Sequence, residues 1–155
     1  MKLKTRDIVY IGFIAALCAV ATTIRIEVPA GAMVHLGSAA LFTTSILFGG
    51  LYGGLGAAIG SALFDLFGGH TQYIVFSFFI KGIAGLIVGG LTAGYWPPSI
   101  TKPTASFGRI LVALIIGAIW TAFGYFLAWW FVLESAVVAA SKIQYSLITS
   151  AAGIV

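Results

Sequence analysis

The sequence reads HLGSAALFTTSILFGGLYGGLGAAIGSALFDLFGG over residues 35–69, and this stretch decides the topology of the chain. It is apolar throughout, and its only formal charge is Asp65, near the far end. A glycine cluster, GGLYGGLG at residues 49–56, lies in its middle. The stretch is either one membrane-spanning helix or two short helices that meet at the glycines. This choice fixes which polar residues share one side of the membrane.

The composition is that of an integral membrane protein. Of the 155 residues, 61% are hydrophobic and only 8% are charged, and the mean hydropathy is +1.11. A soluble domain carries about 25% charged residues. A spanning helix needs about 20 apolar residues, so the length allows about five or six helices. The long apolar runs lack the strict alternation of a transmembrane barrel, and the net charge of +4 is too small and too scattered for a nucleic-acid surface.

Loop charges favour two helices in the organising stretch. Lys2, Lys4 and Arg6 precede the first apolar segment and predict a cytoplasmic N-terminus by the positive-inside rule. One long helix would leave Lys102 and Arg109 outside the cell, whereas two short ones place them in the cytoplasm. The sequence therefore predicts an all-α integral membrane protein with a single membrane domain, residues 1–155, and six transmembrane helices at about 7–25, 37–50, 53–67, 72–95, 109–133 and 136–155.

The two short helices impose a packing constraint. Each has about 15 residues and a length of about 22 Å, less than the hydrocarbon core of about 30 Å. We expect neighbouring helices to bury them, and the glycine pairs Gly50/Gly54 and Gly56/Gly60 allow close helix contact. Residues 26–36 form a longer connection than a tight hairpin requires, so this loop is expected to cover something.

Six spans bring several polar side chains to the outer end of the molecule. An ionisable group at membrane depth costs at least about 2.5–3.5 kcal/mol on insertion scales, so by default it marks a site or a buried pair. Two alternatives stay open: Asp65 pairs with Lys81 without a ligand role, and Lys142 snorkels to the outer interface. The predicted binding residues are His35, Asp65, His70, Gln72, Tyr73, Lys81, Trp129 and Tyr145.

Motifs of catalysis are missing from the sequence. There is no G-x-x-x-x-G-K-[ST] loop, so the chain cannot drive transport by its own ATP hydrolysis. No serine lies in a G-x-S-x-G elbow, and the two histidines have no carboxylate or thiolate neighbours at metal-ligand spacing. We expect no catalytic residues, no metal site and no cofactor.

Small residues form a strip along the first predicted helix. Gly12 and Ala16 are four residues apart, as are Ala15 and Ala19, and such spacing lets another helix approach closely. Composition alone favours packing of this strip inside the protein.

The organising stretch, continued by HTQYIVFSFFIKGIAGLIVGG at residues 70–90, resembles the substrate-binding S components of energy-coupling factor (ECF) vitamin transporters. The patterns H-L-G…G-G-x-x-G-G and D-L-x-x-G…I-K-G-x-x-G carry the resemblance, which covers the first five predicted helices. Among these S components, the chain resembles the riboflavin-type subgroup, which includes proteins assigned to pyridoxine or hydroxymethylpyrimidine. The sixth helix departs from the subgroup: residues 144–149 read QYSLIT, where a proline, asparagine and glutamine pattern is expected. This departure counts against riboflavin.

The resemblance implies six helices, a vitamin ligand held near the outer face, and a lid formed by the first loop. It also implies partners in the plasma membrane of a bacterium: a membrane-embedded coupling subunit and two ATPase subunits. S components of this family are thought to topple in the membrane and carry the ligand inward. In that family the small-residue strip docks onto the coupling subunit, which here assigns docking to Gly12, Ala15, Ala16 and Ala19.

The polar residues favour a small aromatic ligand. Hydroxyl groups and a ring nitrogen suit Asp65, His70, Gln72 and Lys81, which points to pyridoxine or hydroxymethylpyrimidine. One alternative is riboflavin, which needs more aromatic walls and a larger cavity. Another is a structural or assembly membrane protein whose polar residues only pair internally.

Overall fold

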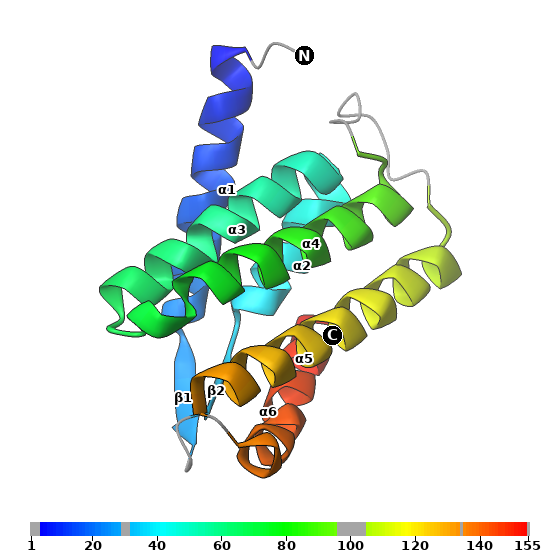
Figure 1. The fold of residues 1–155 in the computed structure, drawn as a ribbon. Helices are drawn as coiled ribbons and strands as arrows, with labels where there is room; N and C mark the ends of the chain where they lie inside the picture. Colours follow the sequence, from blue (N-terminus) through cyan, green and yellow to red (C-terminus); the bar gives the residue numbers. More distant parts are fainter. Residues whose placement is uncertain (1–3, 29–31, 96–104, 134, 155) are drawn as a thin grey trace.

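The protein folds as a helical bundle with a small β-hairpin at one end (Figure 1). The structure is a computed structural model that describes residues 4–28, 32–95, 105–133 and 135–154, with the backbone alone at residues 27, 28 and 32. Lys2 and Lys102, which entered the topology argument, lie outside these residues. The elements in chain order are α1 (Thr5–Thr23), β1 (Arg25–Val28), β2 (Ala32–His35), α2 (Gly37–Phe48), α3 (Gly50–Phe67), the short 3-10 helix η2 (Thr71–Tyr73), α4 (Ile74–Thr92), α5 (Phe107–Leu133) and α6 (Ala136–Ile154).

The organising stretch breaks into two helices at Gly49, as the loop charges predicted. Gly49 has a φ of 84°, in the left-handed region that L side chains rarely adopt. Its N–H donates to the carbonyl oxygen of Ser45 (3.0 Å), so α2 closes at the residue before α3 begins. The predicted start at 37 and end at 67 agree with the structure. Because Gly49 alone makes the turn, the inner ends lie at Phe48 and Gly50 instead of about 50 and 53, and the rest of the glycine cluster belongs to α3. With 12 residues, α2 is about 18 Å long, too short to cross a membrane alone.

Facing glycines bring α3 and α4 into backbone contact. A Cβ atom at Gly85 would lie 2.7 Å from the Cα and N atoms of Gly54, and one at Gly54 would lie 2.9 Å from the carbonyl oxygen of Gly82. Further along, a Cβ atom at Gly89 would collide with the backbone of Gly50. The two helices therefore lie side by side at a separation that only glycine allows (Figure 1). The close helix contact predicted from the glycine spacing is confirmed.

A second side of α3 packs against α1. A Cβ atom at Gly60 would collide with the carbonyl oxygen of Ala15, and one at Gly56 would collide with the side chain of Ile14. Ala15 is consequently buried, with 3% of its surface exposed. Ala15, one of the four residues expected to dock onto a partner, is therefore covered by α3 in this structure and not open at the surface.

The first connection is a β-hairpin and not an irregular loop. β1 and β2 pair antiparallel, with Arg25 opposite His35. The hairpin lies at the end of the bundle where α1 ends (Figure 1). The hydroxyl of Thr149 on α6 donates to the carbonyl oxygen of Met33 in β2 (3.4 Å). The all-α prediction thus holds for the bundle, and the hairpin is an addition to it.

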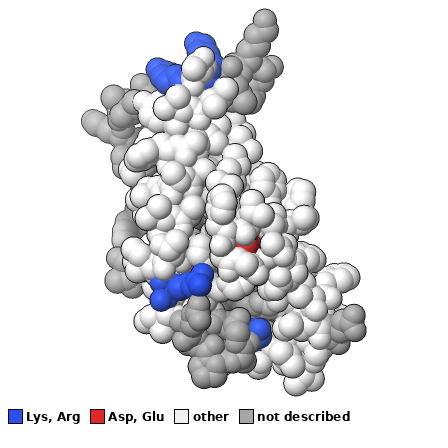
Figure 2. All heavy atoms as spheres, turned by 90° about the vertical axis from the view of Figure 1, so that its left-hand side faces the viewer, with Lys and Arg blue, Asp and Glu red and all other residues white. Residues whose placement is uncertain are grey.

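Helix lengths and charge placement fit a membrane protein. Figure 2 shows one side of the molecule, on which Lys and Arg side chains lie near the top and in the lower part. The broad band between them is white apart from one small Asp or Glu surface near its lower edge. The predicted ranges 7–25, 72–95, 109–133 and 136–155 correspond to α1, η2 with α4, α5 and α6, with ends that differ by a few residues. Among the described residues, the helical segments long and apolar enough to span a membrane are Thr5–Thr23, Gly50–Phe67, Thr71–Thr92 and Phe107–Leu133.

Gly85→Ala tests the backbone contact between α3 and α4. The added methyl group must push the helices apart, and overpacking of this kind costs about 1–3 kcal/mol. In a chain of this size, each kcal/mol lowers the Tm by roughly 2–4 °C. We expect Gly85→Ala to melt below wild type in detergent when followed by circular dichroism.

Gly108→Ala is the matched control for this substitution, since a Cβ atom there meets nothing within 4 Å. Equal melting temperatures for the two variants would contradict the contact.

Candidate functional site

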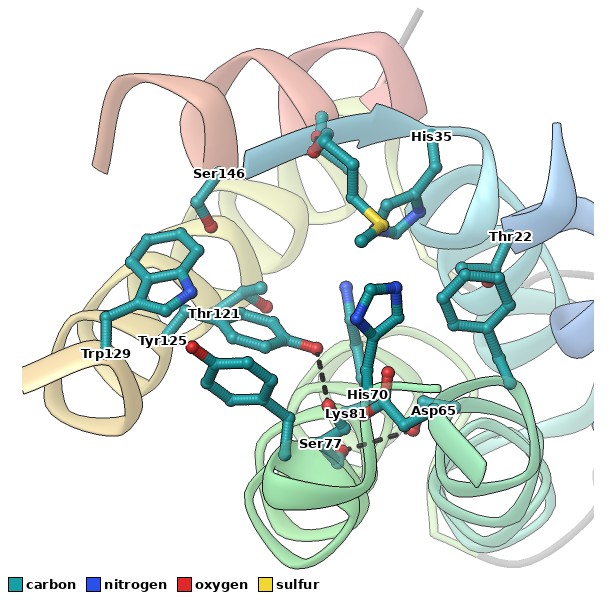
Figure 3. A pocket seen from close by; sticks show the side chains of 15 residues that line it. Thr22, His35, Asp65, His70, Ser77, Lys81, Thr121, Tyr125, Trp129 and Ser146 are labelled. Carbon is teal, nitrogen blue, oxygen red and sulfur yellow. Dashed lines mark hydrogen bonds between the residues drawn. The ribbon is translucent and has the colours of Figure 1, made fainter. Parts of the chain in front are cut away.

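A cavity of about 90 Å³ lies at the hairpin end of the bundle, away from the N-terminus (Figures 1 and 3). Its walls come from α1, β2, the loop before η2, η2 itself, and α3 to α6, so the fold assembles it from segments far apart in sequence. The residues that line it are Thr22, Met33, His35, Ser61, Phe64, Asp65, His70, Tyr73, Ser77, Lys81, Thr121, Tyr125, Trp129, Ser146 and Thr149.

Six of the eight predicted binding residues line this cavity: His35, Asp65, His70, Tyr73, Lys81 and Trp129. Gln72 and Tyr145 do not. Gln72 is exposed in η2, and Tyr145 is half-buried on α6. Each is the chain neighbour of a lining residue, Tyr73 or Ser146, and successive residues of a helix point in directions about 100–120° apart. The structure therefore places these two side chains outside the cavity.

Lys81 supplies a buried ammonium group. The residue is 5% exposed, and its Nζ donates to the hydroxyl of Ser38 on α2 (3.0 Å). The same Nζ lies 5.5 Å from the ring centroid of Tyr125, within the range of a cation–π contact. An ammonium has three protons to donate, so these two contacts leave donor capacity for a further acceptor.

Asp65 and His70 each present a buried atom with no hydrogen-bond partner in the part of the chain that the structure describes. These atoms are Oδ2 of Asp65 and Nε2 of His70. Asp65 is only 7% exposed. No ion pair joins it to Lys81 among the described residues, so the alternative in which these two residues only pair with each other is not what the structure shows. Buried polar groups are normally hydrogen-bonded, and exceptions call for a partner that is absent.

His35 is held as a neutral donor. The backbone N–H of Gly37 donates to Nδ1 of His35 (3.1 Å), so the proton of the neutral ring is on Nε2. Burial, reinforced by the positive charges of Lys81 and Arg25, lowers the pKa of His35 from its usual 6.5 to about 3. A Cβ atom at Gly37 would collide with the hydroxyl of Thr22 and would lie 2.8 Å from Nδ1 of His35. The glycine is therefore required for this arrangement.

Tyr125 and Trp129 on α5 form an aromatic wall on one side of the cavity (Figure 3). Their ring centroids are 5.6 Å apart, with 31° between the ring planes. The Tyr125 hydroxyl lies 3.1 Å from the hydroxyl of Ser77 on α4. On the other side of the wall, Nζ of Lys142 on α6 lies 5.8 Å from the Trp129 ring.

Helical spacing would have found lining residues that the sequence interpretation missed. Ser77 is four residues from both Tyr73 and Lys81, and Tyr125 is four residues before Trp129, so each lies on the same helix face as a predicted residue. Their hydroxyls were overlooked because they carry no charge. The lining residues missed are Thr22, Met33, Ser61, Phe64, Ser77, Thr121, Tyr125, Ser146 and Thr149.

The small-residue strip on α1 is partly available at the surface. Gly12 and Ala16 are exposed and Ala19 is half-buried, while Ala15 is buried against α3. At about 100° per residue, Gly12, Ala16 and Ala19 lie within about 60° of one another around α1.

The cavity groups suit a small ring with polar substituents. An unpartnered carboxylate oxygen, a buried ammonium, an imidazole N–H and an aromatic wall converge on one space, as in ligand sites with a few placed polar groups. Within the described ranges, no group of three or more His, Cys, Asp or Glu side chains is placed to hold a metal ion.

Comparison with known proteins identifies the family. Residues 2–155 match the family described as "ECF-type riboflavin transporter, S component". The chain belongs to this family. The members of this family are described as S components of ECF-type transporters, and the resemblance found in the sequence is confirmed.

Two further proteins are similar to this S component. A protein of Pyrococcus woesei, described as "Uncharacterized protein in gap 3'region", is 35% identical over 103 residues, which are 66% of this chain. The match spans 63% of the length of that relative. A solved S component of a bacterial ECF transporter superposes with a TM-score of 0.72, covering 98% of this chain and 90% of that one. At 16% sequence identity, this likeness shows the fold alone.

His35→Gln tests the neutral state of His35 in this S component. The folded protein keeps the pKa of His35 near 3, whereas the unfolded chain takes up the proton near 6.5. The contribution of His35 to stability is therefore complete above about pH 6.5 and is lost as the pH falls toward 3. We expect the Tm of wild type to fall more steeply on acidification than the Tm of His35→Gln. Parallel curves of Tm against pH for the two proteins would contradict a neutral His35.

Proposed function

We propose that this S component captures a small, polar, single-ring vitamin of the pyridoxine or hydroxymethylpyrimidine class in the cavity beside the hairpin. The observation that carries the proposal is that two cavity-lining residues, Asp65 and His70, have buried atoms, Oδ2 and Nε2, without a hydrogen-bond partner among the described residues. A buried polar group left without its hydrogen bond costs about 1–3 kcal/mol, and more when it is charged. A ligand that hydrogen-bonds to these atoms recovers that free energy on binding.

The remaining polar groups fit other substituents of such a ring. Lys81 has donor capacity for a hydroxyl or ring-nitrogen acceptor, and His35 offers a neutral N–H. The aromatic wall of Tyr125 and Trp129, with Tyr73 nearby in the lining, offers faces on which a flat ring stacks. Together these groups would fix both the position and the orientation of a small aromatic ligand.

Cavity size favours the smaller of the two candidate ligands. The volume of about 90 Å³ is below the roughly 150 Å³ of an engineered apolar cavity that binds benzene. A substituted single ring would enter after modest movement of the lining side chains. A fused-ring molecule with a side chain would need a larger rearrangement.

Riboflavin is the second candidate, because the family that the chain matches is named for it. Its isoalloxazine ring system and ribityl chain would require the hairpin and the aromatic wall to move apart. The two candidates are therefore compared directly in the binding experiment below.

The proposed orientation places the N-terminus in the cytoplasm and the cavity at the outer face of the cell membrane, with six membrane crossings. Lys4 and Arg6 are exposed at the end of α1 that lies away from the hairpin, as the positive-inside rule requires of a cytoplasmic end. α2, too short to span alone, would cross while buried among its neighbours.

The proposed partners are a membrane-embedded coupling subunit and two ATPase subunits, which would power transport as the S component topples and releases its ligand inward. Gly12, Ala16 and Ala19 are the proposed contact with the coupling subunit. A Cβ atom at Gly12 meets nothing within 4 Å, so this side of α1 is open. Figure 1 shows the N-terminal part of α1 extending beyond the rest of the bundle, where another helix could pack against it.

Asp65→Asn and His70→Ala test the binding site. Asp65→Asn removes a charged acceptor, and a hydrogen bond to a charged group contributes about 1.5–3 kcal/mol, so we expect roughly 10- to 100-fold weaker binding. His70→Ala removes the unpartnered Nε2, and the loss of an ordinary hydrogen bond of about 0.5–1.5 kcal/mol should weaken binding by roughly 2- to 10-fold. Isothermal titration calorimetry on the purified protein, with pyridoxine, hydroxymethylpyrimidine and riboflavin in turn, measures this. Gln144→Ala is the control, because Gln144 is exposed on α6 and does not line the cavity.

The titration decides between the binding site, the ligand class and the alternative of a structural protein. Unchanged affinity in both variants would overturn the site, and preferential binding of riboflavin would overturn the ligand class. If wild type binds no vitamin, the alternative of a structural or assembly protein is supported instead.

Ala16→Trp tests the docking surface. The large ring would fill the open strip without entering the cavity, so we expect vitamin uptake by cells to be lost while the purified protein binds ligand with unchanged affinity. Leu17→Trp is the control, since Leu17 is also exposed but lies about 100° further around α1. Normal uptake by Ala16→Trp cells would rule out docking at this strip.

A further inference from the structure

Lys142 is a buried cation that the binding site described above does not use. It lies on α6, is 5% exposed, and does not line the cavity. In the described part of the chain its ammonium has no hydrogen bond or ion pair. Its contact is with the face of Trp129, at 5.8 Å from Nζ to the ring centroid. A lysine held at membrane depth is costly and by default has a function.

Snorkelling accounts for the buried carbon chain of Lys142 but not for the aromatic ring that its ammonium faces. A lysine that snorkels buries its carbon chain and keeps its ammonium in water at the interface. Lys142 is buried almost completely, and its ammonium is directed to the ring of Trp129 on the neighbouring helix α5. The contact lies within the roughly 6 Å over which a cation is attracted to the face of an indole, the strongest of the aromatic partners.

A chain of aromatic contacts leads from Lys142 to the cavity. Trp129 is 5.6 Å from Tyr125, and the Tyr125 ring in turn lies 5.5 Å from Nζ of Lys81. The aromatic wall thus has an ammonium group at each end, Lys81 from α4 and Lys142 from α6. The hydroxyl of Ser77 holds the Tyr125 end of the wall in addition. On the Trp129 side, Lys142 is the polar contact that ties the indole to α6.

We propose that Lys142 is a positioning residue, which holds the indole of Trp129 in place as a wall of the cavity and thereby sets ligand affinity and selectivity without touching the ligand. A ring already held in its bound orientation loses less freedom when the ligand arrives, so this preorganisation strengthens binding. The effect on ligand binding rests on the function proposed above, whereas the contact between Lys142 and Trp129 is a property of the protein alone.

The first test needs no ligand. The protein contains four tryptophans, so labelling with 5-fluorotryptophan gives a ¹⁹F NMR spectrum in which Trp129→Phe identifies the Trp129 resonance. We expect Lys142→Met to shift and broaden that resonance, and Lys142→Arg, which keeps a cation able to stack on indole, to leave it near the wild-type position. Gln144→Met is the matched control, an exposed position on the same helix.

The second test is a double-mutant cycle on ligand affinity. Loss of a cation–π contact changes affinity by at most roughly 2- to 30-fold, and we expect Lys142→Met to weaken binding within that range. Lys142→Arg should restore it. In a Trp129→Leu background, Lys142→Met should have no further effect, because the residue through which it acts is gone.

The outcomes separate this inference from the proposed function. If wild type binds no vitamin, the proposed function fails and the ¹⁹F spectra alone decide the positioning contact. An unshifted Trp129 resonance in Lys142→Met overturns the contact. A shifted resonance with an affinity loss that persists undiminished in Trp129→Leu overturns the positioning role and shows that Lys142 meets the ligand directly.

Discussion

The backbone contact between α3 and α4 is the constraint on which the rest of the structure depends. Gly54 and Gly85 let the two helix backbones touch, and Gly56 and Gly60 let α1 approach α3 from another side. A membrane offers little hydrophobic driving force between helices, so van der Waals packing of this kind provides much of the association. With α3 fixed among its neighbours, Asp65 near its far end is held in a buried position at the edge of the cavity.

The same packing explains why the cavity is electrostatically unusual. Asp65 and Lys81 are both buried, yet they do not form an ion pair with each other among the described residues. Lys81 is instead drawn to Ser38 and to the face of Tyr125. In a medium of low dielectric constant an unpartnered polar group is costly, and rigid helices prevent the site from collapsing to remove that cost. The polar groups of such a site that lack a partner can form hydrogen bonds with a complementary ligand.

Much of this arrangement could be predicted from the sequence, and the failures have physical reasons. Loop charges correctly divided the organising stretch, and ionisable residues at membrane depth located Asp65 and Lys81 in the cavity. Hydroxyl-bearing residues such as Ser77 were missed because an uncharged side chain in a membrane helix has a low insertion cost. The sequence therefore does not mark it as a functional residue. The burial of Ala15 depends on which helix packs against α1, and the hairpin depends on cross-strand pairing. Neither is readable from small-residue spacing or composition.

The central claim is that this S component holds a single-ring vitamin by means of the unpartnered groups of its cavity. Mass spectrometry of the small molecule that co-purifies with the protein tests it most directly, because the measurement assumes no ligand in advance. The account predicts a single-ring vitamin of the pyridoxine or hydroxymethylpyrimidine class, recovered in a smaller amount from Asp65→Asn than from wild type. Recovery of riboflavin, or of the same molecule in equal amount from Asp65→Asn, would contradict it.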